Sequence, residues 1–136
     1  MATPQEGLAA LRAAADSGAL AELCARHGIR ILTVFGSVAR AGQSPRDLDI
    51  GIMFEPGVAP DHLAAIGDLV DLTGVENVDV AHLNRGGPVI RERALVGSVA
   101  LYESEPGALA GAQISAIGER IDTDRMRQLD LELLAG

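Results

Sequence analysis

The sequence predicts an α/β fold, a small mixed β-sheet flanked by helices that lie on one side of it. Two observations support this prediction: short β-branched, apolar runs alternate with segments of helical periodicity, and turns rich in Gly and Pro separate them. Aromatic residues make up only 2% of the chain, so we expect a core of Ala, Leu, Val and Ile. A length of 136 residues predicts a single domain, residues 1–136.

Helices are expected over residues 1–28, at the start of the chain. Apolar residues recur at helical spacing over residues 5–27. Asp16-Ser17-Gly18 is expected to interrupt this pattern and to begin a second helix, which ends at Gly28. The one cysteine of the chain, Cys24, lies in that second helix. A lone cysteine agrees with a cytoplasmic location, and we expect a buried, unreactive thiol.

Residues 29–103 are expected to form the core of the fold. β-branched and apolar runs predict its strands, amphipathic periodicity predicts its helices, and Gly-, Ser- and Pro-rich stretches predict its loops. In chain order these elements are a strand at 29–35, a loop at 40–46, a strand at 48–54, a helix at 61–73, a strand at 77–83, a helix at 88–96 and a strand at 98–103. Residues 104–136 are predicted to be helical. Their Ile and Leu residues are expected to pack on the body of the domain or, alternatively, to form a surface for a partner.

Three aspartates are candidate catalytic residues and metal ligands. Asp47 and Asp49 open the second strand, where residues two apart share one face with Cα atoms about 6.6 Å apart. Carboxylates in this arrangement repel each other unless they bind a cation, and Mg²⁺ prefers such oxygen ligands together with substrate phosphates. Asp79 could reach the same cluster if its strand lies beside that of the other two. Three carboxylates could hold one ion or two, and a pair of ions can promote an in-line phosphoryl displacement.

The dipeptide Gly36-Ser37 follows the first strand and is a candidate phosphate-binding turn. Backbone N–H groups there could hold phosphate oxygens, the glycine would allow close approach, and the serine hydroxyl could add a hydrogen bond. Arg40 is near enough in sequence to help neutralise phosphate charge. Gly-Ser and Asp-x-Asp each occur in ordinary turns and on solvated faces, so the specificity lies in their ordered combination.

Other polar residues have simpler interpretations. His82 alternates away from Asp79 along its strand, so we do not expect it to bind the metal. His62 is expected at the surface. Arg91 and Arg93 are expected on a solvated helix face, with contact to a nucleotide or a partner as the alternative.

Charge and hydropathy exclude several classes of function. The net charge is −8, and an acidic chain is poorly suited to bind nucleic acid through its phosphates. The charge suits a cation, a basic protein, or a substrate that arrives with Mg²⁺. No stretch reaches the roughly 18 consecutive apolar residues of a membrane helix, and the N-terminus lacks the pattern of a signal peptide. We therefore expect neither a nucleic-acid nor a membrane partner.

The ordered motifs resemble the minimal nucleotidyltransferase (MNT) family, the antitoxin half of HEPN/MNT toxin–antitoxin pairs, within the DNA polymerase β type of nucleotidyltransferases. The family pattern Gly-Ser-x-Ala-Arg, a loop, and Asp-x-Asp is present as Gly36-Ser37-Val38-Ala39-Arg40 and Asp47-Leu48-Asp49. Downstream, the stretches "VDVAHLN", "IRERAL" and "SVALYE" also resemble the family, so the similarity covers residues 31–103. Ala41 and Arg46 depart from the commonest form of the loop, and Arg46 could pair with the first aspartate or bind phosphate.

The resemblance implies a polymerase β-like fold and a specific reaction. The residues that would bind metal are Asp47, Asp49 and Asp79, and those that would bind the nucleotide are Gly36, Ser37 and Arg40. The implied activity is the transfer of AMP from ATP, with two Mg²⁺ ions, to a hydroxyl of a protein. The acceptor would be a tyrosine of a HEPN-type toxin, an RNase that the modification silences.

Two alternatives to this activity come from different classes of function. The chain could neutralise its toxin by contact alone, with a weak or vestigial nucleotide site. It could instead modify a small molecule such as an aminoglycoside, although relatives of that kind usually carry a larger second domain over the acceptor. A homo-oligomer is compatible with each of these functions.

Overall fold

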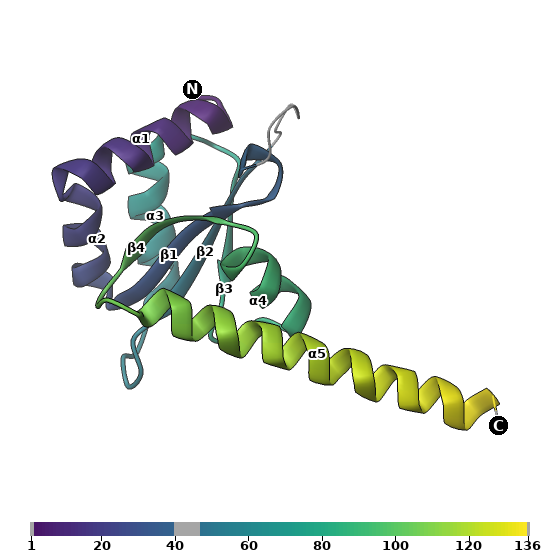
Figure 1. Ribbon diagram of the computed structural model, residues 1–136. Helices are drawn as coiled ribbons and strands as arrows, with labels where there is room; N and C mark the ends of the chain where they lie inside the picture. Colours follow the sequence, from purple (N-terminus) through teal and green to yellow (C-terminus); the bar gives the residue numbers. More distant parts are fainter. Residues whose placement is uncertain (1, 40–46, 136) are drawn as a thin grey trace.

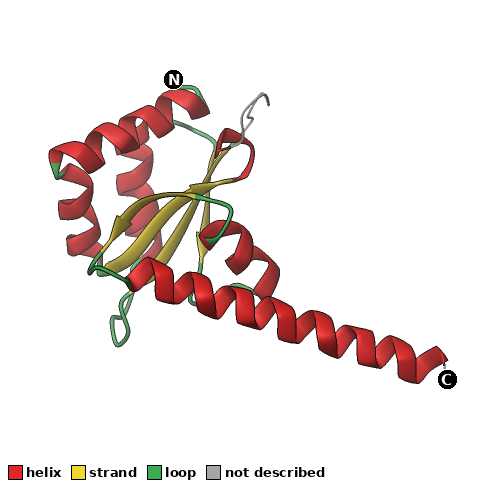
Figure 2. Cartoon of the chain, viewed as in Figure 1, coloured by secondary structure: helices red, strands yellow, loops and turns green. Residues whose placement is uncertain are grey.

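A four-stranded mixed sheet lies at the centre of the protein (Figures 1 and 2). The computed structural model describes residues 2–39 and 47–135. The strands, in the spatial order β3-β2-β1-β4, are β1 (Ile29–Phe35), β2 (Leu48–Phe54), β3 (Val78–His82) and β4 (Val99–Glu103). β1 pairs antiparallel with β2 and β4, whereas β3 lies parallel to β2. The predicted mixed sheet is confirmed, and each strand begins and ends within one residue of its predicted range.

Five α-helices surround this sheet. They are α1 (Pro4–Ser17), α2 (Ala19–His27), α3 (His62–Thr73), α4 (Pro88–Leu95) and α5 (Ala108–Ala135). Gly18 separates α1 from α2, and Gly28 follows the end of α2. The predicted interruption and the predicted end of the second helix are therefore confirmed.

The helices cover both faces of the sheet, so the expectation of helices on one side is wrong (Figure 2). A large apolar cluster joins α1, α2 and α3 to one face, and a smaller cluster joins α4 and α5 to the other. The reason is visible in β1, where Leu32 and Val34 belong to the first cluster and Ile31 and Phe35 to the second. A strand that is apolar at almost every position, as this one is, is buried on both faces.

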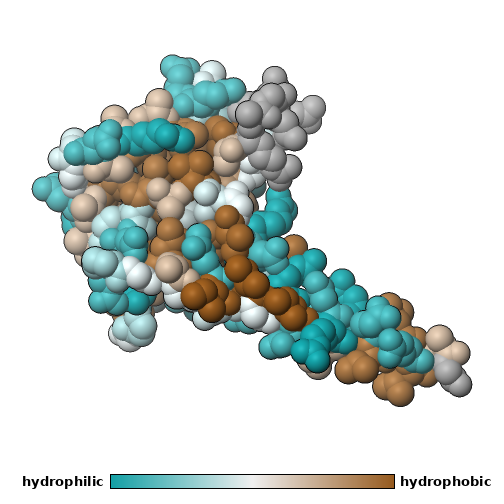
Figure 3. Space-filling view, viewed as in Figure 1, coloured by the Kyte–Doolittle hydropathy of each residue, from teal (hydrophilic) through white to brown (hydrophobic). Residues whose placement is uncertain are grey.

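The helix α5 extends well beyond the sheet (Figures 1 and 3). It rests on the body through small side chains: Ala108 and Ala116 are buried, and Ala112 packs on the same cluster. Its large apolar side chains are exposed, namely Ile114, Ile117, Ile121, Met126, Leu129, Leu131, Leu133 and Leu134. The expectation that these residues pack on the body is therefore wrong, whereas their exposure agrees with the alternative of a partner surface. Within the described residues, no helix has the length and apolar character needed to cross a bilayer.

Candidate active site

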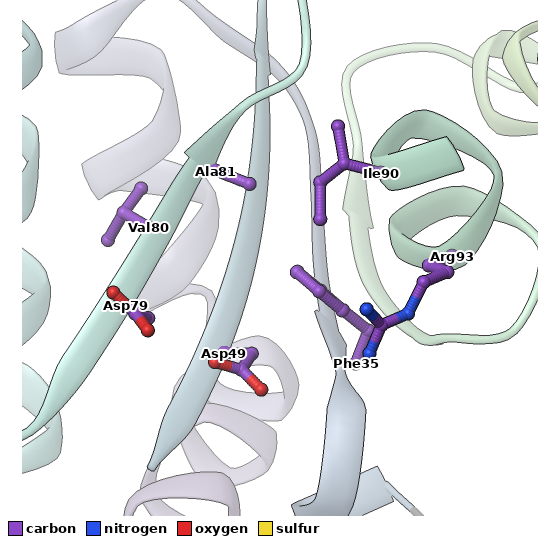
Figure 4. Close-up of a pocket in the computed structure, with 7 residues that line it drawn as sticks. All are labelled: Phe35, Asp49, Asp79, Val80, Ala81, Ile90 and Arg93. Carbon is purple, nitrogen blue, oxygen red and sulfur yellow. The ribbon is translucent and has the colours of Figure 1, made fainter. Parts of the chain in front are cut away.

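Two aspartates lie side by side on neighbouring strands, on the face that α4 and α5 cover. Asp49 of β2 is the register partner of Asp79 in β3 and of Phe35 in β1. Since register partners project to the same face, both carboxylates border one pocket (Figure 4). Asp47 immediately precedes β2 and is exposed. The prediction that the strand of Asp79 lies beside that of Asp49 is confirmed.

Burial and like charge act together on Asp49. The side chain is half-buried, and this desolvation raises the pKa of the Asp49 carboxyl above its ordinary value of 3.8. The negative charges of Asp79 and Asp47 raise the pKa further, whereas the positive charge of Arg93 lowers it. Any cation that binds beside Asp49 would relieve this repulsion.

The three aspartates provide a donor set that fits a divalent cation, because hard carboxylate oxygens are the ligands that Mg²⁺ uses. Within residues 2–39 and 47–135, however, no three His, Cys, Asp or Glu side chains are arranged as a ready metal cluster. The roles of Asp47, Asp49 and Asp79 as metal ligands therefore stay a prediction, supported by the common face of Asp49 and Asp79 and by the charge effect on Asp49.

A four-residue 3₁₀ helix, η1 (Gly36–Ala39), follows β1 at the predicted phosphate-binding turn. Gly36 has a φ of +77°, in the region that side chains disfavour. A Cβ atom at this position would lie 2.1 Å from Oδ2 of Asp49. Glycine is required here for both reasons, and the turn lies directly against the carboxylate that is expected to bind metal.

The other predicted nucleotide ligands are described only in part. Ser37 lies in η1 and is half-buried. Arg40 and Arg46 lie outside the described residues. Their predicted contacts with phosphate stay predictions.

A cavity of about 240 Å³ opens at the two aspartates (Figure 4). Its lining residues are Phe35, Asp49, Asp79, Val80, Ala81, Ile90 and Arg93. Arg93 extends from α4 toward the Asp49 side of this cavity. The residue is exposed, as expected for a solvated face, and its place at the pocket agrees with the alternative of contact to a nucleotide. The order of the strands in the sheet bears on the position of Arg93. Because α4 connects β3 to β4 at opposite edges of the sheet, it must cross one face, and the face it crosses is the one that carries Asp49.

Three other residues confirm or correct expectations away from this pocket. His82 lies on the opposite face from Asp79, as predicted, with its ring centroid 5.1 Å from that of Phe54. His62, expected at the surface, is half-buried, and its ring centroid lies 5.2 Å from that of His82. Cys24 is buried, and burial raises the pKa of its thiol to about 12, which confirms an unreactive cysteine.

Comparison with known proteins identifies the family. The sequence profile described as polymerase beta, nucleotidyltransferase matches residues 19–106, more than half of the chain. A solved structure described as that of a minimal nucleotidyltransferase is 39% identical, with a TM-score of 0.53, over 70% of this chain and 93% of its own. The chain belongs to the MNT family of polymerase β-type nucleotidyltransferases. The predicted family, fold and enzyme class are thereby confirmed.

More distant structures share the fold of this MNT protein. One, described as a toxin–antitoxin with AMP-PNP, has a TM-score of 0.66 at 15% identity, over 86% of this chain and 96% of its own. Another is described as a tri-AMPylated Shewanella oneidensis HEPN toxin in complex with an MNT antitoxin, with a TM-score of 0.62 at 14% identity, over 88% of this chain and 95% of its own. A search among curated proteins found no match.

Proposed function

We propose that this MNT protein is a Mg²⁺-dependent adenylyltransferase that transfers AMP from ATP to a hydroxyl of a HEPN-type toxin and thereby acts as its antitoxin. The observation that carries the proposal is the pairing of Asp49 with Asp79 directly against the Gly36 turn. A family of nucleotidyltransferases needs carboxylates for the cations and a turn for the phosphates, and here the two adjoin.

The nucleotide would bind with its phosphates at the turn that follows β1. The backbone N–H groups of Gly36 and Ser37 and the Ser37 hydroxyl would donate to phosphate oxygens, and Arg40 would neutralise their charge. Support for nucleotide binding comes from a structure described as a toxin–antitoxin with AMP-PNP, which shares the fold. When bound, Mg²⁺ would neutralise the triphosphate and polarise the reacting phosphorus centre.

The chain's own residues would direct the transfer. The acceptor oxygen attacks the α-phosphorus of ATP, the bond from that phosphorus to the bridging oxygen breaks, and pyrophosphate leaves. Asp79 would orient the acceptor hydroxyl and accept its proton, because it lies on the outer strand of the pair beside Asp49. Asp47 and Asp49 would hold the cations and, through them, the triphosphate.

A protein acceptor agrees with the surface of α5. Exposed isoleucines and leucines lie along this helix, which leaves the body of the domain, and Figure 3 shows apolar areas both near the body and at the far end of the helix. Large apolar patches of this kind commonly mark protein–protein contacts. Among the proteins that share the fold, one is described as an MNT antitoxin bound to a tri-AMPylated HEPN toxin, and we infer the same class of partner, with a tyrosine as acceptor.

The second candidate function is an antitoxin that binds its toxin without modifying it. The exposed surface of α5 would support binding whether or not transfer takes place. The paired carboxylates favour the enzyme, because like charges brought together at the Gly36 turn destabilise a fold that does not use them.

Intact mass spectrometry of the toxin separates the two candidates. The purified chain, a HEPN-type toxin, ATP and Mg²⁺ are mixed, and the wild type is compared with Asp47→Ala/Asp49→Ala. We expect the toxin to gain one or more AMP units only with the wild type. An unmodified toxin whose RNase activity is suppressed equally by both proteins would exclude the enzyme and leave the binding antitoxin.

A matched control uses an aspartate from the opposite face of the sheet. Asp71 is an exposed residue of α3, so Asp71→Ala removes one carboxylate without touching the pocket. This variant should modify the toxin as the wild type does. Loss of transfer in Asp71→Ala would indicate a general effect of charge rather than a role for the paired aspartates.

A further inference from the structure

Arg93 is the cationic side chain among the described residues that line the pocket of Asp49 and Asp79. It lies on α4, and Figure 4 shows its guanidinium group directed from that helix toward the sheet. Its positive charge acts on Asp49, where it opposes the repulsion from the neighbouring carboxylates. A guanidinium that faces two carboxylates across a cavity is well placed for a ligand that carries both cations and negative charge.

The helix that carries Arg93 is firmly held against the sheet. The buried Thr33 hydroxyl donates to the carbonyl of Ala94 at 2.6 Å, one residue from Arg93. Beneath this contact Gly51 has no space for a side chain, since a Cβ atom there would lie 2.7 Å from Thr33 Oγ1 and 3.1 Å from Ala94 Cβ. The backbone of α4 therefore lies as near the sheet as packing allows, which fixes the origin of the Arg93 side chain.

Arg91, two residues before Arg93, also anchors α4. Its guanidinium donates to the carbonyl of Leu83, and its Nε lies 3.3 Å from the Glu119 carboxylate of α5. The expectation of a solvated face is wrong for Arg91, whose largely buried side chain has a structural role. The two arginines of α4 therefore serve different purposes: Arg91 holds the helix, and Arg93 reaches the pocket.

The position of α4 tells which part of a nucleotide Arg93 would meet. Among the strands, α4 contacts mainly β1, which ends next to Gly36, and β2, which carries Asp49 near its start. Asp79, which is proposed to orient the acceptor, lies one strand further out on β3. Arg93 is therefore on the phosphate side of the pocket rather than on the acceptor side.

We propose that Arg93 binds the β- and γ-phosphates of the nucleoside triphosphate and stabilises the pyrophosphate as it leaves. This inference rests on the proposed function, because it assigns a further residue to the same site. The planar guanidinium can donate two parallel hydrogen bonds to phosphate oxygens, which a lysine cannot do. It also supplies positive charge on the side of the pocket formed by α4.

Calorimetric titration with two nucleotides in the presence of Mg²⁺ tests this assignment. Arg93→Gln should weaken the binding of ATP by about tenfold to a hundredfold, the usual effect of losing a charged hydrogen-bonding partner, and leave the binding of AMP unchanged. The affinity of Arg93→Lys for ATP should lie between those of the wild type and Arg93→Gln, because lysine keeps the positive charge but cannot donate two parallel hydrogen bonds. Arg12→Gln, an exposed residue of α1 on the opposite face, removes the same charge and should bind both nucleotides as the wild type does.

Three outcomes would overturn the inference. Equal loss of affinity for ATP and AMP would make Arg93 a structural residue. Unchanged affinity for ATP together with a raised KM for the acceptor protein would move Arg93 to the acceptor side. A wild type that binds no ATP would overturn both this inference and the proposed function.

If instead the wild type binds ATP but transfers nothing, the proposed transfer fails while the titrations still decide the role of Arg93. Should Arg93→Gln not fold, the ratio of ATP to AMP affinity in Arg93→Lys decides it.

Discussion

The carboxylate of Asp49 occupies the space where a side chain at position 36 would begin, 2.1 Å from its Oδ2 atom. The turn after β1 and the first residues of β2 are thus one unit, although residues 40–47 separate them along the chain. A change in the turn must move the carboxylate, and a change at the carboxylate must alter the turn.

Gly36→Ala should therefore impair both stability and function. The left-handed backbone alone costs about 1–2 kcal/mol for a residue with a side chain, and overpacking against Asp49 adds about 1–3 kcal/mol. Gly57→Ala is the matched control, since Gly57 has a φ of +80° with nothing within 4 Å of a Cβ atom. Urea unfolding and ATP binding of both variants check this prediction. Equal losses in the two would mean that the contact with Asp49 has no consequence.

Asp49→Asn should stabilise the metal-free protein at neutral pH. The pKa of Asp49 is raised in the folded state, so the fold binds this proton more tightly than the unfolded chain does. Stability is then lost as the pH rises from the ordinary value of 3.8 through the raised pKa, and the asparagine does not suffer that loss. Thermal unfolding at neutral pH should favour the variant, and the difference should shrink below pH 3.8. Mg²⁺ should stabilise the wild type more than the variant, and a variant that is less stable at neutral pH would contradict the prediction.

Thr33→Val should loosen α4 and, with it, the pocket. The substitution keeps the shape of the side chain and removes the donor to the Ala94 carbonyl, which costs about 1–3 kcal/mol when a buried partner is left unsatisfied. Affinity for ATP should fall with it, because the same helix carries Arg93. Thr123→Val, at a half-buried position on α5, provides the comparison. Denaturant unfolding measures the free energy of unfolding, and calorimetry measures the affinity for ATP. If Thr33→Val is less stable but binds ATP as the wild type does, the position of α4 does not determine ATP binding.

Charged substitutions on the exposed face of α5 should weaken toxin binding and leave ATP binding unchanged. Ile114 and Ile121 are 72% and 52% exposed, so Ile114→Glu/Ile121→Glu should change the free energy of unfolding by less than about 1 kcal/mol. Binding to the toxin should weaken by about tenfold or more, whereas ATP binding should not change. Leu63→Glu on α3, where the leucine is 81% exposed, tests whether any exposed apolar residue has this effect. Toxin binding that is weakened equally by Leu63→Glu, or not at all by the α5 variant, would place the partner elsewhere.

The sequence predicted the elements well where local signals define them. β1 and β2 are mostly apolar runs bounded by glycine and polar residues, so composition and turn chemistry locate both ends. The same signals placed Asp47, Asp49 and Asp79 at strand positions from which they can meet. The pairing of β2 with β3 could not be predicted from the sequence and was only assumed as a condition. Which strands become neighbours depends on contacts across the whole sheet.

Three features escaped prediction for physical reasons. The first is the helical cover on the second face of the sheet. It could have been predicted only if the largely apolar sequence of β1 had been interpreted as burial on both faces. Arg93 is exposed, as expected, but its place beside the pocket depends on the path of α4 over the sheet, which follows from strand order and not from the local sequence. In α5 the residues that touch the body are alanines, and alanines give little periodic signal beside the larger residues that stay exposed.

The far end of α5 lacks the packing that makes helices stable in proteins. Every residue from 124 to 135 is exposed, and a segment of this size is at the limit of about 12–15 residues below which isolated helices are marginal in water. Its amide hydrogens should exchange with solvent far faster than those of β1 and β2. A partner that covers this segment must first hold it in helical form, so part of the contact energy is spent on ordering, and the complex dissociates more readily than its contact area suggests.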